Sequence, residues 1–580
     1  MDRLMTETTE AVPPPGAGAQ PAAPGPPVSE LDPRRWLALA SVMTALFMVL
    51  LDVSIVNVAI PAIRSNLAAN NADIQFVIAG YGLAYAVLLI TGGRLGDIFG
   101  RKRLFIIGMS GFVIASALCG LAQSAIMLDL SRVLQGAMAA MMYPQVLSVI
   151  QVTFPPQERA KVFGLVGAVI GIATITGPLA GGLIIRNDIT GGSWRWIFLV
   201  NLPIGIASLI AATRLITESR APNAKRLDII GVLLATAGIL LLVYPLVEGQ
   251  VAGWPAWTFI CMAISPVMLV LFVLYERSLP STRFPLVQLS LFRIRSFSVG
   301  VAISAVFIAG IPAFFFTFSL MVQVGLGFSA LNAGLTTIPW SLASAVASAL
   351  STRVAPRLGK YTIAIGSTLL VIGMLGVIGT LHLEGTKLTG WDLIPSFVVS
   401  GLGLGTVIAP LLNIILAGVP GRDAGSASGV LTTFQQLGGA IGVAVVGVVF
   451  FGLLSSRAAS STAAVTPQLQ AQLAAANVPA PAAQAAISHF NVCFKEQASS
   501  SDPSAPIPGC TTTGSGPTAA AFASAAQSAL GTDFVSSLER ILFFNVGFWA
   551  LTGLLSMLLP RARPQPVVGA APASGAAHAG

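Results

Sequence analysis

Runs of about 20 apolar residues recur along most of this 580-residue chain, and they constrain its fold more than any other feature. A helix of about 20 apolar residues crosses the roughly 30 Å hydrocarbon core of a bilayer. Only helices and closed barrels satisfy all of their backbone hydrogen bonds in lipid. The runs are continuous rather than alternating, and only 9% of the residues are charged, against roughly 25% in soluble domains. The sequence therefore predicts an all-α polytopic membrane protein.

Fourteen spans account for the apolar runs. We expect them at about 36–60, 74–93, 104–122, 126–150, 162–185, 196–216, 228–248, 255–276, 298–322, 331–351, 361–382, 393–418, 425–453 and 538–559.

The distribution of basic residues sets the expected orientation. With both termini inside, the inner loops and tails hold more than three times as many Lys and Arg residues as the outer loops. This asymmetry is the topological signal of an inner-membrane protein, so we expect a multi-pass protein of the plasma membrane, bacterial in origin, with cytoplasmic termini. The net charge of +9 is explained in the same way and does not indicate nucleic-acid binding.

A weak internal repeat indicates two related halves. GRLGDIFGR (93–101) aligns with TRVAPRLGK (352–360), about 260 residues later, and parallel halves around a midplane site are common in secondary transporters. We expect a disordered N-terminal tail, a six-helix half, an inserted helix pair, a second six-helix half and a C-terminal tail, at residues 1–35, 36–226, 227–277, 278–560 and 561–580 respectively.

The stretch 454–537 is rich in Ala, Ser, Pro and Gln, and it should form an extracytoplasmic loop. A linker is the favoured interpretation and a small lid the alternative. Cys493 and Cys510 fall in this stretch, where an oxidising compartment would permit a disulfide between them; free thiols are the alternative.

Several motifs occur in an order that resembles one family. They are LLDVSIVNVAIP (50–61), GRLGDIFGRKR (93–103), SRVLQGAMAAMMYPQ (131–145), GIATITGPLAGG (171–182), WRWIFLVNLPIG (194–205) and FPLVQLSLFRIRSF (284–297). Together they resemble the major facilitator superfamily, specifically its fourteen-span drug:proton antiporters of the EmrB/QacA type. Ser54 and Ile98 depart from the usual residues of the first two motifs. The resemblance implies the major facilitator fold, with two six-helix halves and two additional helices.

Asp52 and Arg132 are the candidate proton-coupling residues. An ionised carboxylate in lipid costs at least about 2.5–3.5 kcal/mol, so Asp52 should face a partner or a wet cavity. Helical rise places Asp52 and Arg132 at similar depths on the outer side. We hypothesise that Arg132 tunes proton binding at Asp52. The alternatives are a structural polar role for Asp52 and a local ion pair between Asp129 and Arg132, which share a helical face.

The stretch GGRLGDIFGRKR combines a basic anchor with a conformational gate. Topology explains the basic residues but not Asp97, Gly93 or Gly100. The resemblance implies that Asp97 and its basic neighbours, including Arg101, latch the two halves on the cytoplasmic side. An acid beside a helix N-terminus would be favourable, and the span that begins at Lys360 is a candidate partner.

The fifth span carries an antiporter motif with closely spaced small residues. Its pairs at i and i+4 predict tight helix packing, and its proline predicts a kink. The resemblance associates this motif with export rather than uptake. The motif residues are Gly171, Gly177, Pro178, Gly181 and Gly182.

A wide aromatic cavity with one or two acids would suit small amphipathic or hydrophobic substrates, many of them cationic. The candidate substrate-contacting residues are Asn57, Tyr81, Tyr85, Gln135, Phe315, Trp340, Gln435 and Gln436. Packing within the membrane is the alternative role for each of the aromatic ones.

The expected function is proton-coupled multidrug or antibiotic efflux by alternating access. Export of an endogenous product, such as a lipid, siderophore or self-made antibiotic, is the alternative, and a lipid-modifying enzyme or a channel is a remote one. The three histidines do not cluster and no GxxxxGK[ST] motif occurs, so we expect no metal, no cofactor and no enzyme activity, with the proton gradient as the energy source. The sequence leaves the oligomeric state open, with a monomer as the expectation.

Overall fold

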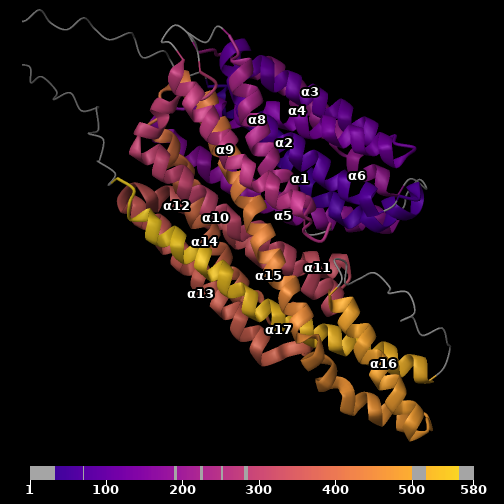
Figure 1. The fold of residues 1–580 in the computed structure, drawn as a ribbon. Coiled ribbons are helices and arrows are strands. Elements are labelled where there is room, and N and C mark those ends of the chain that lie inside the picture. Colours follow the sequence, from indigo (N-terminus) through magenta and orange to yellow (C-terminus); the bar gives the residue numbers. More distant parts are fainter. Residues whose placement is uncertain are drawn as a thin grey trace, which may run out of the picture.

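A computed structural model describes residues 33–69, 71–187, 193–221, 226–249, 252–279, 285–499 and 517–560. Within these ranges every regular element is a helix (Figure 1). The expected tails fall almost entirely outside them.

The first half contains six long helices. They are α1 (Arg35–Leu67), α2 (Asn71–Phe99), α3 (Arg101–Gly120), α4 (Ala125–Thr153), α5 (Pro156–Asn187) and α7 (Asn201–Leu215), and the short η1 (Ser193–Arg195) and α6 (Trp196–Leu199) precede α7. These helices pack on one another, with α4 against α2 and α3, and α1 against α5 and α7.

Two helices, α8 (Ile229–Glu248) and α9 (Ala256–Ser278), follow as a pair. They pack against each other, and α8 also contacts α2 of the first half and α15 of the second half. The pair therefore lies at the edge of the contact between the two halves.

The second half is built from six further long helices. They are α10 (Arg295–Leu320), α12 (Ile338–Leu358), α13 (Lys360–Glu384), α14 (Ile394–Ala417), α15 (Ala424–Ala475) and α17 (Pro517–Ser556). Shorter elements connect them, namely η2 (Leu289–Arg293), η3 (Met321–Gly325), α11 (Ala330–Thr336), η4 (Gly385–Lys387), η5 (Gly421–Asp423) and α16 (Ala480–Ser499).

The all-helical prediction for a membrane protein is confirmed. Among the described residues, 13 helical segments are long and apolar enough to cross a membrane. The helix α5 is not one of these segments, but its 32 residues give it the length of a further span. We count α5 as the fourteenth span because it packs between α1 of its own half and α12 and α14 of the other.

The polar stretch 454–537 differs from the expected linker, because much of it is helical. The helix α15 continues to Ala475, α16 covers Ala480–Ser499, and α17 already begins at Pro517. In Figure 1 these segments extend beyond the rest of the second half at the lower right. They share an apolar core that includes Leu469, Phe490 and Ala529, and small and apolar residues at helical spacing provide its surfaces. The Ala-rich composition, which suggested a linker, thus belongs to packed helices in this stretch.

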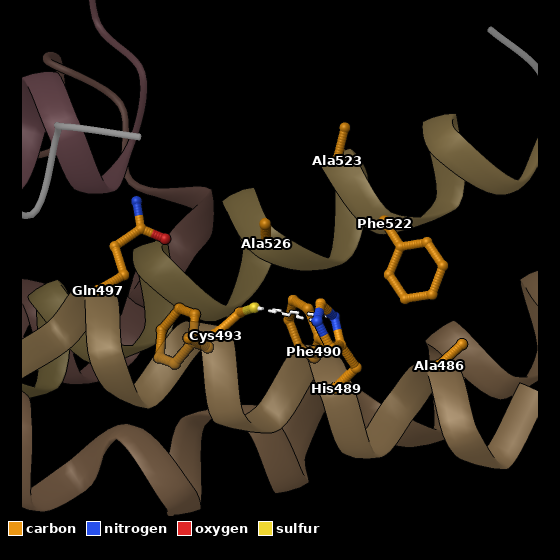
Figure 2. A pocket seen from close by; sticks show the side chains of 9 residues that line it. Ala486, His489, Phe490, Cys493, Gln497, Phe522, Ala523 and Ala526 are labelled. Atoms are coloured by element: carbon orange, nitrogen blue, oxygen red, sulfur yellow. Dashed lines mark hydrogen bonds between the residues drawn. The ribbon is translucent and has the colours of Figure 1, made fainter. Parts of the chain in front are cut away.

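The face of α16 carries a cavity of about 280 Å³ (Figure 2). Phe490, Phe522 and His489 line it, and the Cys493 sulfur lies 3.7 Å from His489 Nδ1. Cys493 is disulfide-bonded. Its expected partner, Cys510, lies outside the described residues, so the pairing remains a prediction.

Glycines set how closely the long helices approach. A Cβ atom on Gly442 of α15 would overlap the carbonyl oxygen of Ala309 in α10, and one on Gly136 of α4 would overlap that of Tyr81 in α2. Helices in lipid gain little from the hydrophobic effect and associate through such close packing. Other positions on the same helices are open, as at Gly452 of α15.

The variants Gly442→Ala and Gly452→Ala test this packing within one helix. Both remove a flexible residue from a helix interior, which favours the helix by up to about 1 kcal/mol. We expect Gly442→Ala to lower stability by about 1–3 kcal/mol because the backbones must separate. Gly452→Ala should leave stability unchanged or raise it. The measurement is the apparent melting temperature in detergent, and equal melting temperatures would contradict the account.

Candidate functional site

A buried ion pair joins the first and fourth spans. Arg132 Nη1 lies 2.5 Å from Asp52 Oδ2, and both side chains are almost fully excluded from solvent. The geometry expected from their depths is therefore confirmed. Among the ion pairs of the described residues, Arg132 pairs with Asp52 and not with Asp129, whose Oδ1 is buried without a hydrogen-bond partner.

Amide and hydroxyl groups complete the surroundings of this pair. Gln135 Nε2 donates to Asp52 Oδ1 at 2.8 Å, and Gln135 Oε1 accepts from Arg132 Nη1 at 2.7 Å. Asn201 Nδ2 lies 3.4 Å from Asp52 Oδ1 and donates to Ser116 Oγ at 3.1 Å. Four helices, α1, α3, α4 and α7, thus contribute polar groups to one buried network.

Arg132 is fixed from its other sides as well. Its Nε donates to the carbonyl oxygen of Val77 at 3.0 Å, and its guanidinium lies 4.3 Å from the ring centroid of Tyr81. A cation over an aromatic face gains about 2 kcal/mol or more when water is excluded. Arg132 would therefore keep partners on α2 if the Asp52 carboxylate became neutral.

The network of Asp52, Arg132 and Gln135 can bind a proton at the Asp52 carboxylate. Protonation of Asp52 would remove the charge that balances Arg132, whereas Gln135 can hydrogen-bond both residues and bridge them. In a low-dielectric surrounding, such a change of charge alters the stability of the local packing strongly. The network could therefore couple proton binding to a rearrangement of α1 against α4.

A second buried acid lies where the two halves meet. Asp97, at the end of α2, accepts from the backbone N–H of Gly425 at 3.1 Å and of Ser426 at 2.9 Å. Both amides belong to the first turn of α15, whose own N-cap residue, Asp423, makes no side-chain capping bond. The first amides of a helix have no partner within it, so Asp97 caps α15 from the opposite half.

The predicted position of Asp97 beside a helix N-terminus is confirmed, but the partner differs from the expected one. The Asp97 carboxylate contacts α15, whereas the Lys360 ammonium at the start of α13 bonds the Met557 carbonyl. Lys360 lies on a helix that packs against α17 and α14, within its own half.

Arg101 supports Asp97, and Gly100 lies beside a second carboxylate that caps a helix. Arg101 Nη2 lies 2.8 Å from Asp97 Oδ1 and also donates to the carbonyl oxygen of Gly421 at 2.8 Å, across the interface. Gly100 has φ +109° and precedes α3, and a Cβ atom there would overlap the Glu218 carboxylate. That carboxylate accepts from the amides of Lys102 and Arg103, so it caps α3 as Asp97 caps α15.

Glycines let the halves approach at two helix pairs. A Cβ atom on Gly93 of α2 would overlap the Gly425 carbonyl oxygen of α15. On α5, Gly171 lies against the Ser341 carbonyl oxygen of α12, whereas Gly177 and Gly181 lie against Ser54 and Ile55 of α1. The predicted close packing of the antiporter motif is confirmed. A Cβ atom on Gly182 would make only an ordinary contact with Leu331, and the side chain of Pro178 lies outside the described part.

The described hydrogen bonds between the halves lie toward one end of the molecule. They join α2, α3 and α4 to the corner between α14 and α15, and they join Gly164 of α5 to Ser348 of α12. By the expected topology this is the cytoplasmic end, so in that orientation the two halves are bonded to each other on the inner side.

The expected substrate-contacting residues are distributed over both halves. Tyr81 stacks on Tyr85 at 6.0 Å beside Arg132, and Gln135 belongs to the Asp52 network. In the second half, Phe315 and Trp340 lie 5.6 Å apart in an aromatic cluster with Phe314 and Phe397. These residues pack on one another, so their role as substrate contacts remains a prediction.

The remaining candidates are two glutamines and an asparagine. Gln435 is half-buried and donates to Ser304 Oγ at 2.8 Å, and Gln436 is half-buried beside it. The side chain of Asn57 lies outside the described part. Sequence reasoning missed Asn201 as a partner of Asp52, although an amide within the apolar run of WRWIFLVNLPIG was a signal. It also missed Ser116, which accepts from Gln135 and Asn201.

Comparison with known proteins identifies relatives of the whole chain. The model of the Major Facilitator Superfamily matches residues 42–443. The chain is 39% identical over 569 residues to the probable actinorhodin transporter of Streptomyces coelicolor, covering 97% of both proteins. It is 35% identical to the tetracenomycin C resistance and export protein of Streptomyces glaucescens, covering 74% of this chain and 78% of that protein.

A third relative is the multidrug efflux pump LfrA of Mycolicibacterium smegmatis, which is 30% identical over 78% of this chain and 88% of that protein. Among solved structures, the human organic anion transporter MFSD10 superposes with a TM-score of 0.53 at 14% identity, covering 72% of this chain and 94% of that chain. This likeness concerns the fold alone.

A double-mutant cycle tests the buried pair independently of any transport activity. Asp52→Asn leaves the Arg132 charge without its counter-charge, and Arg132→Met does the same to the Asp52 charge. Loss of one partner of a buried ion pair lowers the free energy of unfolding by about 3–5 kcal/mol. The double variant removes both charges, so we expect it to lose less stability than the two single losses together. Thermal unfolding in detergent measures all four proteins. Strictly additive losses would show that the two residues are not coupled.

Proposed function

Because this chain belongs to the Major Facilitator Superfamily, we propose that it exports small amphipathic or hydrophobic compounds from a bacterial cell in exchange for protons. It is a multi-pass membrane protein, and we place it in the plasma membrane with both termini in the cytoplasm. The proton gradient serves as its energy source, with no cofactor and no chemical step on the substrate.

The names of the relatives support efflux. They describe a probable actinorhodin transporter, a tetracenomycin C resistance and export protein and a multidrug efflux pump. The observation that carries proton coupling is the pair Asp52–Arg132, because it is a buried carboxylate balanced by one cation and bridged by Gln135. A group of this kind can exist with or without its proton while its neighbours stay hydrogen-bonded.

The proposed cycle begins from the inner-closed arrangement. A proton from outside neutralises Asp52 and frees Arg132 toward Gln135 and the Tyr81 ring, both of which it already contacts. This change loosens α1 from α4 and favours rocking of the two halves. The latch at Asp97 then breaks, the inner side opens, the proton leaves to the cytoplasm and substrate enters.

The driving force is adequate for such a cycle. One charge that moves through 100 mV releases about 2.3 kcal/mol. The free energy needed to shift a balanced two-state equilibrium tenfold is about 1.4 kcal/mol. A single proton per cycle can therefore bias the equilibrium between the inner-closed and inner-open states.

Export of one endogenous compound is the second candidate function. It is favoured by the relatives that are named for a single compound, one of which matches over 97% of this chain. The two candidates share the same membrane mechanism and differ in substrate range. A panel of compounds therefore distinguishes them.

The first experiment expresses the chain in a pump-deficient bacterial host and measures susceptibility to a panel of amphipathic drugs, with and without an uncoupler. We expect resistance to several compounds, its loss with uncoupler, and its loss in Asp52→Asn at equal membrane abundance. Resistance to a single compound class would favour the second candidate. Full proton-driven export in inside-out vesicles by Asp52→Asn would contradict the role of this carboxyl group.

The second experiment replaces the latch carboxylate. Asp97→Asn keeps an acceptor but loses the charge that pairs with Arg101 and caps α15, so we expect transport to fall about tenfold or more while membrane insertion stays normal. Asp392→Asn at the outer end of α14 is the control, because Asp392 bonds only its neighbour Thr389 among the described contacts. Unchanged transport in Asp97→Asn would reduce the motif to a membrane anchor.

A further inference from the structure

A buried amide on α4 reaches across the interface between the halves, close to the Asp97 latch. Gln151 Nε2 donates to the carbonyl oxygen of Leu416 at 2.7 Å and to that of Val419 at 2.9 Å. Gln151 is 1% exposed, and its two acceptors lie at the end of α14. None of the motifs that mark the chain as a transporter contains this residue.

The chemistry of the contact fits a helix C-terminus. The last carbonyls of a helix have no partner in the regular helical pattern, and the Leu416 carbonyl accepts from the Val419 N–H of the following turn. A carbonyl has two lone pairs and a side-chain amide offers two hydrogens, so Gln151 can donate to both Leu416 and Val419. The end of α4 is itself fixed, because Arg159 donates to the carbonyl oxygens of Gln151 at 2.7 Å and Phe154 at 2.9 Å. Gln151 is thus held in place where it meets α14.

The same short corner is bonded at three places by the first half. Between α14 and α15, Gln151 binds the carbonyl end of α14, Arg101 binds the Gly421 carbonyl in the middle, and Asp97 binds the amide end of α15. The Asp97 carboxylate lies at the amide end of α15, where the helix dipole favours a negative charge, and the Gln151 amide donates at the carbonyl end of α14.

We propose that Gln151 is a further fixed point of the inner gate, in addition to Asp97 and Arg101, and that the corner 416–426 is the element it holds. This inference rests on the proposed alternating-access function. Asp97 and Arg101 bond only the part of the corner at residues 421–426, so without Gln151 the end of α14 could separate from the first half on its own. The attachment at Leu416 and Val419 opposes this separation, so opening requires both ends of the corner to leave the first half together.

Two serines provide a reporter of the closed gate. Ser148 Oγ on α4 lies 3.3 Å from Ser428 Oγ on α15, so cysteines at both positions should form a disulfide only while the inner side is closed. The double variant Ser148→Cys, Ser428→Cys is prepared in a Cys261→Ala background. Oxidation in native membranes without substrate is followed by mass spectrometry of the bridged peptides.

Gln151→Met is the test variant and Gln145→Met is its matched control. Both replace a buried amide of α4 with an unbranched side chain of similar length. Gln145 bonds the Gly92 carbonyl within the first half, whereas Gln151 bonds the opposite half. We expect Gln151→Met to lower the ratio of inner-closed to inner-open protein about tenfold, because two buried hydrogen bonds between the halves are lost.

The expected result is slower disulfide formation and slower transport in Gln151→Met, with disulfide formation near the parent rate in Gln145→Met. Parent-like disulfide formation in Gln151→Met, or an equal loss in both variants, would overturn the proposal. The disulfide measurement uses no substrate and no proton gradient, so a failure of the proposed export function would appear in the susceptibility panel and leave this result intact.

Discussion

Two backbone amides at the start of α15 have no partner within their own helix, and the Asp97 carboxylate of the opposite half accepts from both. In a protein interior without water, such groups cost several kcal/mol if they are left unpaired. The first half therefore supplies what the second half lacks. The glycines of α2 and α15 permit this approach, because a Cβ atom on Gly93 or Gly425 would separate the two backbones. The contact between the two halves at this end depends on the pairing of these amides with Asp97.

The same constraint shapes the outer part of the first half. Asp52 and Arg132 are tolerated in a membrane-spanning bundle because each neutralises the other and because Gln135 and Asn201 occupy the remaining hydrogen-bonding positions. The two buried acids thus differ in kind. Asp97 is bonded by backbone amides of the opposite half as well as by Arg101, whereas Asp52 is bonded only by side chains of its own half among the described contacts. The first suits a gate and the second suits a proton site.

Much of this arrangement could be predicted from the sequence. The apolar runs predict helices, and the glycine spacings predict close packing. The positions of Asp52 and Arg132 along their spans predict similar depths in the membrane, which is consistent with the observed ion pair. The partner of Asp97 could not be predicted, because amides at the start of α15 leave no mark in residue types. The role of Gln151 could not be predicted for the same reason, because its partners are backbone carbonyls, which every residue has. The stretch 454–537 was misjudged because alanine suits linkers and helices alike, and only the buried faces around Leu469 and Phe490 distinguish them.

In the proposed mechanism, proton binding at Asp52 and substrate transport are thermodynamically linked. The most direct measurement is the affinity of the purified protein for the compound that the susceptibility panel identifies, taken as a function of pH. Linkage predicts that substrate affinity changes with pH in the parent protein and that substrate addition changes the number of bound protons in weakly buffered solution. Both effects should vanish in Asp52→Asn. Substrate affinity that is independent of pH, with no proton uptake or release on binding, would contradict the account.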